Sequence, residues 1–292
     1  MSKKNFCLLL STFILWGSMY PVSKVALRSV PPVALLALRY LVSVPSLFLL
    51  LKVRGTMKPI RKGDHKILFA IGFLGYFFSF CLQMLGIARL SGSVSSLLGA
   101  MNPIFIPILA AIFLGEKITP AKVICVAVSM IGVVTIVGTG GTVSVSGALF
   151  MLASVFLWSS TSILIRRVSS HYDPMQVAMT ATAFALPFTG IWALFELRTA
   201  SFSLPLSSLL AVLYMGFIGT AIAHSLWNAC LKRMDASFCS MFYPLQPLVS
   251  SILGVLFLGE QITPNFIIGA VIVCCGIVAA VMAGKDTGKA KA

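Results

Sequence analysis

The side chains that could bind or transform a small molecule lie inside long apolar runs of this sequence. Tyr76, Phe80 and Gln83 are spaced by four and three residues, which puts them on one face of a helix. Aromatic rings and an amide in such a place can stack on and hydrogen-bond a neutral or zwitterionic, partly apolar solute. The rings could also hold an organic cation by cation–π contact. The pattern therefore indicates a binding site.

Other apolar runs carry polar and aromatic residues at a similar depth. Asn102 and Gln246 each directly precede a proline, and Trp16 shares one helix face with Tyr20. Polar groups in hydrocarbon are costly unless they are satisfied, so we expect these side chains to face one wet internal cavity. The predicted substrate-binding residues are Trp16, Tyr20, Tyr76, Phe80, Gln83, Asn102, Trp158, Ser162, His224, Trp227, Asn228, Tyr243 and Gln246.

Each assignment has a simpler structural alternative. Asn102 and Gln246 could only bond a neighbouring helix, as amides in membrane helices often do. Trp16 and Trp158 could be interfacial anchors, although both lie well inside their runs. His224 is the side chain deep in a run that titrates near neutral pH, and it could be a ligand, a proton carrier or a neutral packing residue.

Arg39 and several prolines also lie within apolar runs. Arg39 is a possible contact for an anionic group, but it could instead snorkel toward the membrane surface or hold the carbonyls of a helix end. A proline inside a helix frees a carbonyl and permits bending. The predicted hinges are Pro21, Pro103, Pro107, Pro244 and Pro247.

Groups that would support catalysis, metal binding or proton relay are missing from the apolar runs. The seven acidic residues all lie in predicted loops or at helix ends, so no carboxylate is expected at mid-membrane. The sequence has neither an H-E-x-x-H zinc helix nor a G-x-S-x-G nucleophile elbow, and its seven cysteines show no C-x-x-C spacing. We therefore predict no enzyme activity, no metal and no cofactor.

The elements that must position these residues are membrane spans. The 292 residues are 59% hydrophobic and 10% charged, whereas soluble domains carry roughly 25% charged residues. The net charge of +15 is spread between apolar runs rather than gathered on one soluble face, which argues against nucleic acid as a partner. We predict an all-α membrane protein with ten transmembrane helices. The predicted spans are 6–27, 33–52, 67–88, 92–114, 120–138, 146–165, 175–195, 207–231, 236–258 and 264–283.

The sequence contains one structural unit twice. The segment LGEKITP at 114–120 returns 144 positions later as LGEQITP at 258–264, and the same offset aligns Arg89 with Arg233. Duplication within a membrane chain is typical of transporters, which build a site between two repeats. The predicted units are a first five-helix repeat at 1–140, a second at 146–284 and a cytoplasmic basic tail at 285–292.

An odd number of spans per repeat makes the second copy enter the membrane from the opposite side. We therefore predict inverted repeats around a central cavity. With the N-terminus inside, all but five of the 22 basic residues fall in predicted cytoplasmic segments, so both termini are predicted to be cytoplasmic. Inversion would put Glu116 at the inner surface and Glu260 at the outer one. A role that both share is then expected to be structural, as a cap or a pin for a short turn.

Several motifs carry a resemblance to a known family. They are Trp-Gly-Ser at 16–18 followed by Pro21 and Lys24, Arg39 in the second span, and a Gly-Glu…Thr-Pro…Gly pattern that closes each half. The sequence resembles the drug/metabolite transporter superfamily, and more closely its EamA-type transporters. The resemblance implies ten helices as two inverted five-helix repeats around a central cavity. It also implies transport of small metabolites, often export of amino acids, by alternating access.

The second copy departs from this pattern where Ser159 and Ile163 replace the glycine and the proline of the first. The predicted function is export or facilitated passage of an amino acid or related metabolite. Organic cations or drugs, and phosphorylated metabolites, are alternative substrates, and a channel is the alternative class. His224 is the best candidate for any proton coupling. The expected partners are the lipid bilayer and a small-molecule substrate, for a monomer or weak dimer in a bacterial cytoplasmic membrane.

Overall fold

The structure, a computed structural model, describes residues 3–90, 92–137 and 144–258 and short stretches between 264 and 279. In these ranges every regular element is a helix. Eight of the described helical runs are long and apolar enough to cross a membrane, and a further helix holds the shorter apolar stretch Val123–Gly132. The predicted all-α membrane fold is confirmed. Glu260, the tail at 285–292 and much of the predicted tenth span lie outside the described residues.

The described helices coincide with the predicted spans from 6–27 to 236–258, with bounds that differ by a few residues. The first half contains α1 (Lys3–Ala26), α2 (Pro32–Arg54), η1 (Lys62–Asp64), α3 (His65–Ala70), η2 (Ile71–Ser79), α4 (Phe80–Arg89), α5 (Gly92–Gly99), α6 (Asn102–Leu114) and α7 (Pro120–Val137). The second contains α8 (Val145–Val168), α9 (Pro174–Glu196), α10 (Leu206–Tyr214), η3 (Met215–Ile222), α11 (Ala223–Arg233), α12 (Ala236–Ser240) and α13 (Leu245–Leu258).

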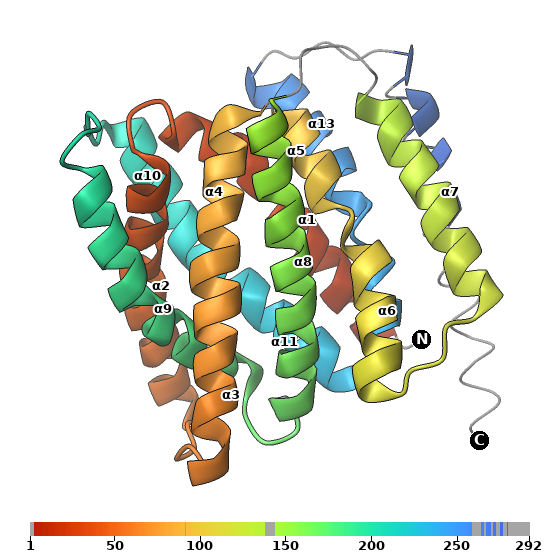
Figure 1. The fold of residues 1–292 in the computed structure, drawn as a ribbon, viewed down its shortest axis with the longest axis horizontal. Coiled ribbons are helices and arrows are strands. Elements are labelled where there is room, and N and C mark those ends of the chain that lie inside the picture. The colour runs from red at the N-terminus through yellow and green to blue at the C-terminus, as the bar shows by residue number, and fades with distance from the viewer. Residues whose placement is uncertain are drawn as a thin grey trace.

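Several of these elements join into single spans. The run Lys62–Arg89 combines η1, α3, η2 and α4, and the run Leu206–Arg233 combines α10, η3 and α11. The spans Val94–Leu114 and Ala236–Phe257 are each interrupted by a turn, between α5 and α6 and between α12 and α13. Figure 1 shows the resulting bundle, with the helices standing side by side and the shorter elements stacked end to end.

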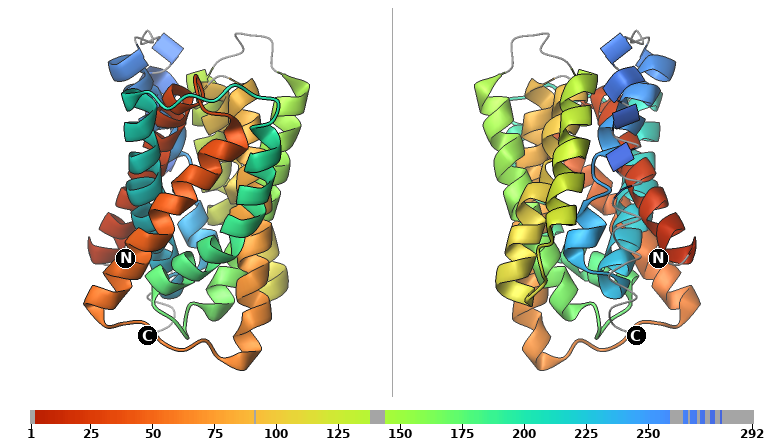
Figure 2. Two further views of the ribbon diagram at one scale, coloured as in Figure 1. Left: turned by 90° about the vertical axis from the view of Figure 1, so that its left-hand side faces the viewer. Right: turned by 90° about the vertical axis from the view of Figure 1, so that its right-hand side faces the viewer.

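The core of the bundle is an interface between the two halves of the chain. The closest packing partners are α2 with α9, α1 with α13, α4 with α8 and α1 with α11. Each pair joins a helix of the first half to one of the second, and the two further views in Figure 2 show segments distant in sequence lying side by side. A site in the middle of the bundle is therefore built by both halves.

The two halves share an unusual π-helical segment. The element η2 begins at Ile71 and η3 begins at Met215, which are equivalent positions at the offset of 144. Within them, Gly75 leaves the space that Thr161 occupies, and its counterpart Gly219 leaves the space that Met19 occupies. π-Helical turns are rare and occur often at functional sites, because the wider winding redirects side chains and carbonyls. Both segments face the interface between the halves.

Glu116 ties the end of the first half to a helix of the second. Its carboxylate accepts hydrogen bonds from the backbone N–H groups of Ala236 (2.9 Å) and Ser237 (3.0 Å) and from the Ser237 hydroxyl (2.6 Å). These N–H groups open α12, where no helical carbonyl can reach them. Glu116 therefore caps a helix, and that helix belongs to the other half.

Glu116→Ala would leave the first N–H groups of α12 without their acceptor. We expect the free energy of unfolding to fall by about 1–2 kcal/mol, measured by thermal unfolding of the purified protein in detergent. Asp235→Asn is the matched control, because Asp235 is exposed and lies 3.9 Å from Arg166 in a surface ion pair, and such pairs contribute little. An unchanged midpoint for Glu116→Ala, or an equal loss for Asp235→Asn, would contradict the capping role.

Candidate functional site

A small cavity lies at the centre of the bundle, between the two halves. Its volume is about 50 Å³, and residues from α1, α2, α4, α5, α6, α8, α11 and α13 line it, together with the turn before α13. A space of this size has room for a few water molecules. The lining residues are Trp16, Met19, Tyr20, Ser23, Arg39, Phe80, Gln83, Met84, Ile87, Gly99, Asn102, Ser154, Val155, Trp158, His224, Tyr243 and Gln246.

Most of the residues that the sequence singled out are brought together here. Trp16, Tyr20, Arg39, Phe80, Gln83, Asn102, Trp158, His224, Tyr243 and Gln246 all line the cavity. Trp16 and Trp158 are buried within the bundle, which is not the position of interfacial anchors. The common feature of the set is depth: each lies at least six residues inside a membrane-length helical run.

Four predicted residues lie behind the wall of the cavity. Tyr76 is fully buried against the rings of Trp158 and His224. The Ser162 hydroxyl donates to the carbonyl of Trp158 (2.9 Å). Trp227 packs against the lining rings of Trp16 and Tyr243, 5.5 Å from each, and the Asn228 amide donates to the carbonyl of Pro174 (3.1 Å). In this conformation these four side chains support the lining residues rather than face the space.

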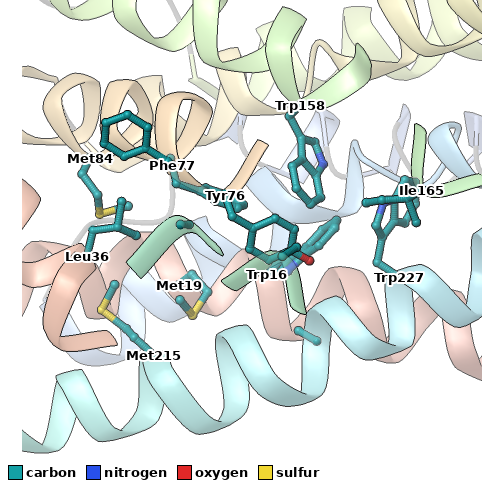
Figure 3. Packing of buried hydrophobic residues seen from close by; sticks show 14 of the residues in the cluster. Trp16, Met19, Leu36, Tyr76, Phe77, Met84, Trp158, Ile165, Met215 and Trp227 are labelled. Atoms are coloured by element: carbon teal, nitrogen blue, oxygen red, sulfur yellow. The ribbon is translucent and has the colours of Figure 1, made fainter. Parts of the chain in front are cut away.

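Aromatic rings form most of the cavity wall. The ring centroid of Trp16 lies 5.9 Å from that of Trp158 and 5.2 Å from that of His224, and Trp158 lies 5.0 Å from Phe80. Most of these contacts are edge-to-face, which is the favoured arrangement for aromatic pairs. Figure 3 shows Trp16, Tyr76 and Trp158 pointing toward one another from three different helices, with Trp227 beyond them.

Two ring nitrogens in this wall have no hydrogen-bond partner in the part of the chain that the structure describes. They are Nε1 of Trp16 and Nε2 of His224, and both are buried. The other ring nitrogen of His224, Nδ1, lies 3.0 Å from the carbonyl of Gly219 in the π-helical segment. Buried polar atoms are normally satisfied, so two unpartnered ones beside a cavity are available to a solute or to water within it.

Amide and hydroxyl groups close one side of the cavity. The Tyr20 hydroxyl donates to the side-chain oxygen of Gln246 (3.3 Å), and the Trp158 Nε1 donates to the Tyr243 hydroxyl (2.8 Å). The Asn102 amide donates to the carbonyl of Gly99 (2.8 Å) at the break between α5 and α6. Asn102 thus satisfies a carbonyl that the interrupted helix frees, and Gln246 holds a lining side chain in place.

Arg39 also lines the cavity, and it is buried there rather than snorkelling to the membrane surface. Its side chain is only 3% exposed, its Nε donates a short hydrogen bond to Oγ1 of Thr220, and its guanidinium carbon lies 5.3 Å from the centroid of Phe80. The next residue of α2, Tyr40, donates to the backbone carbonyl of Tyr76. Tyr76 and Thr220 are equivalent positions in η2 and η3, so α2 contacts both π-helical segments at the same place.

Seven lining residues were not predicted: Met19, Ser23, Met84, Ile87, Gly99, Ser154 and Val155. Two of them carry a signal that was available. Met84 and Ile87 follow Phe80 at spacings of four and seven, so extending that helix face by one turn finds them. Ser154 and Val155 carry no distinctive chemistry, and their place depends on how α8 is rotated.

The five predicted hinge prolines occupy two kinds of position. Pro21 lies inside α1 and Pro107 inside α6, where each interrupts the hydrogen bonding of a helix. Pro103 lies in the first turn of α6, Pro244 lies in the turn before α13, and Pro247 lies in the first turn of α13. Among the described residues, no group of three His, Cys, Asp or Glu side chains could hold a metal ion.

A bundle of membrane-length helices around a small cavity lined by both halves defines a multi-pass membrane protein of transporter type. The family model described as "EamA-like transporter family" matches residues 3–138 and again residues 145–282. The chain belongs to the EamA-like transporter family. The resemblance inferred from the sequence is confirmed.

Relatives of similar length support the same assignment. An "Uncharacterized transporter" of Archaeoglobus fulgidus is 26% identical over 94% of this chain and 97% of its own length. A "Probable amino-acid metabolite efflux pump" of Salmonella typhimurium is 25% identical over 95% of this chain and 94% of its own length. A solved crystal structure shares the fold with a TM-score of 0.80 at 20% identity, covering 98% of this chain and 99% of that one.

Gly99→Ala would place a Cβ atom against the Tyr20 hydroxyl, where there is no space for it. We expect the overpacking to cost about 1–3 kcal/mol, and the cost to shrink in the Gly99→Ala/Tyr20→Phe double variant, which removes the colliding oxygen. Thermal unfolding in detergent measures Gly99→Ala, Tyr20→Phe and the double variant. Gly190→Ala is the control, because a Cβ there meets nothing within 4 Å. Strictly additive effects in the double variant would show that the two residues do not touch.

Proposed function

We propose that this protein transports a small metabolite across the membrane by alternating access, with the central cavity as its binding site. The observation that carries the proposal is the cavity itself. It is lined by both halves, and two of its buried polar atoms, on Trp16 and His224, have no hydrogen-bond partner among the described residues. Sites between the halves of a duplicated membrane chain are typical of secondary transporters.

The proposed cargo is an amino acid or a related metabolite, and the proposed direction is export. Two relatives at about a quarter identity, from Salmonella typhimurium and Escherichia coli, are named as probable amino-acid metabolite efflux pumps. The lining supports such a solute, because aromatic rings suit an apolar side chain and amides suit polar termini. The site residues are those of the cavity wall, with Tyr76, Ser162, Trp227 and Asn228 in supporting positions.

The cavity in this conformation is too small for an amino acid, so the transport cycle requires opening. Ligand pockets commonly measure about 300–1,000 Å³, against about 50 Å³ here. The proline positions and the two π-helical segments supply weak points in the helices that border the cavity. We propose that the helices bend there to expose the cavity to each side in turn.

We also propose that the chain forms ten spans as two inverted repeats, at 1–140 and 146–284, with a cytoplasmic tail at 285–292. Figure 2 supports inversion, because α1 begins at the lower end of the view and α8 begins at the upper end. Basic residues gather at the lower end, where the loop 55–61 carries Lys58 and Arg61 and where α8 ends with Arg166 and Arg167. By the positive-inside rule, that end is the cytoplasmic one, in a bacterial inner membrane.

Trp158→Phe would remove the hydrogen bond to Tyr243 and reshape the aromatic wall. We expect flux of amino acids through proteoliposomes to fall about tenfold or more, in line with loss of a buried hydrogen bond and an aromatic contact. Trp192→Phe is the matched control, because Trp192 packs against Phe77 outside the cavity and should leave flux unchanged. Wild-type flux that never saturates with concentration would favour a channel, and equal effects of the two variants would remove the cavity as the site.

Single cysteines in a cysteine-free background test the proposed topology. We expect Lys58→Cys and Lys117→Cys to react with a membrane-impermeant maleimide only after the cells are opened. Arg198→Cys should react in intact cells, because the proposed inversion puts it on the outer face. The matched positions are all exposed in the structure, so lack of access does not explain a difference. Labelling of all three from the same side would contradict the topology.

A further inference from the structure

Among the described residues that line the central cavity, Arg39 is the one permanently charged side chain. Among the described lining residues there is no aspartate or glutamate, and the side chain of Arg39 is 3% exposed. A buried cation in a membrane bundle is destabilising unless something neutralises it. The cavity therefore carries an uncompensated positive charge.

The protein satisfies only part of the guanidinium. Its Nε donates to Oγ1 of Thr220, and its plane is supported by the ring of Phe80 at 5.3 Å. Within the described part of the chain, the two terminal nitrogens make no hydrogen bond or ion pair. Thr220 is itself fixed, because its hydroxyl donates to the carbonyl of Met215 (3.0 Å) in the π-helical segment. Arg39 is thus held in one orientation with its terminal donors unused.

The acidic groups nearest to the bundle are occupied elsewhere. Glu196 accepts the N–H groups of Val33 and Ala34 (2.9 Å each) at the start of α2. Glu116 caps α12, and Asp64 accepts from Tyr172 (2.7 Å). None of these carboxylates pairs with Arg39. Within the described residues no counter-charge faces Arg39, and an anionic ligand can supply one.

A second depression lies at one end of the bundle, by the last turn of α1, the start of α2 and the segment 200–203. It measures about 760 Å³, and its charged lining residues are Lys24, Arg28 and Glu196, whose carboxylate already accepts the N–H groups of Val33 and Ala34. On α1, Tyr20 and Ser23 line the central cavity and Lys24 lines this vestibule, so the two spaces follow one another along the helix. A solute on this route passes two further basic side chains, which attract anions.

We propose that Arg39 anchors the carboxylate of the transported solute, and that the vestibule of Lys24 and Arg28 is the anion-attracting end of its path. This inference rests on the proposed transport function and narrows its substrate class. The solute is a monocarboxylate or an amino acid whose ammonium group lies against the aromatic wall, where cation–π contact is available. A guanidinium with free terminal nitrogens binds a carboxylate by two parallel hydrogen bonds. Organic cations without a carboxylate are excluded by the same charge.

The test compares three forms of each solute on the purified protein. Leucine and phenylalanine are measured by thermal shift and by proteoliposome counterflow beside their amides, which lack the carboxylate, and beside the deaminated acids 4-methylpentanoate and 3-phenylpropionate. Inorganic phosphate is a further arm. We expect stabilisation by the amino acids and the deaminated acids, and none by the amides or by phosphate.

Two arginine variants complete the experiment. Arg39→Leu should weaken carboxylate binding by about 10- to 100-fold, since hydrogen bonds to a charged partner are lost. Its unliganded midpoint should stay the same or rise, because an uncompensated buried charge is removed and Thr220 keeps its bond to Met215. Arg89→Leu is the matched control, because Arg89 is exposed and bonds only the carbonyl of Leu85 among the described residues, and it should bind carboxylates as the wild type does.

The outcomes separate the two proposals. If the amides stabilise the protein or cross the membrane as well as the acids, or if Arg39→Leu binds carboxylates normally, the anchor is wrong while transport stands. A drop in the unliganded midpoint of Arg39→Leu with unchanged affinity would make Arg39 a packing residue, which also overturns the anchor. If no carboxylate in the panel stabilises the wild type or crosses in a saturable manner, the anchor falls together with the proposed transport function.

Discussion

The organisation of this protein depends on the absence of water between its helices and the lipid. In hydrocarbon, each backbone and side-chain polar group has to find a partner within the protein. Most do so locally, as the Thr182 and Ser225 hydroxyls do by bonding the carbonyl four residues earlier. Those that cannot be satisfied within their own helix turn toward the middle of the bundle. The central cavity is where they meet.

The same requirement explains why the irregular parts of the helices lie beside the cavity. A break in a membrane helix exposes carbonyls and N–H groups, which is tolerated only where protein groups or water can reach them. Asn102 satisfies the carbonyl of Gly99 at one break, and Tyr40 satisfies the carbonyl of Tyr76 in one π-helical segment. The irregular elements and the polar side chains are therefore parts of one arrangement.

The position of α2 links these parts across the two halves. Two adjacent residues of α2 make these contacts: Arg39 bonds Thr220 in η3, and Tyr40 bonds Tyr76 in η2. Thr220 and Tyr76 occupy equivalent places in the two segments. A movement of either π-helical segment therefore changes the surroundings of α2. In the same way, Glu116 couples the turn after α6 to the start of α12. Contacts of this kind allow the two halves to change shape together, because neither can move without disturbing a bond to the other.

Much of the fold could be predicted from the sequence, because hydropathy and duplication are strong signals in membrane chains. The spans and the depth of Trp16 and Gln83 followed from the apolar runs and the helical period. The rotation of each helix about its own axis could not be predicted from these signals. For this reason Trp227 and Ser162 were predicted to line the cavity, whereas in the structure they lie behind its wall. The π-helical segments left no clear trace either, since Gly72 and Gly75 are equally compatible with a regular helix. Long-range partners such as Glu116 and Ala236 depend on packing that no local pattern specifies.

The tight aromatic packing around the small cavity also bears on the leakage of hydrogen ions through the protein. Rings of Trp16, Trp158, Phe80 and His224 fill the centre of the bundle and leave space for a few water molecules. A file of water that crossed the bilayer would let hydrogen ions run down their gradient between cycles. The packed rings leave no room for such a file at the centre of the bundle in this conformation.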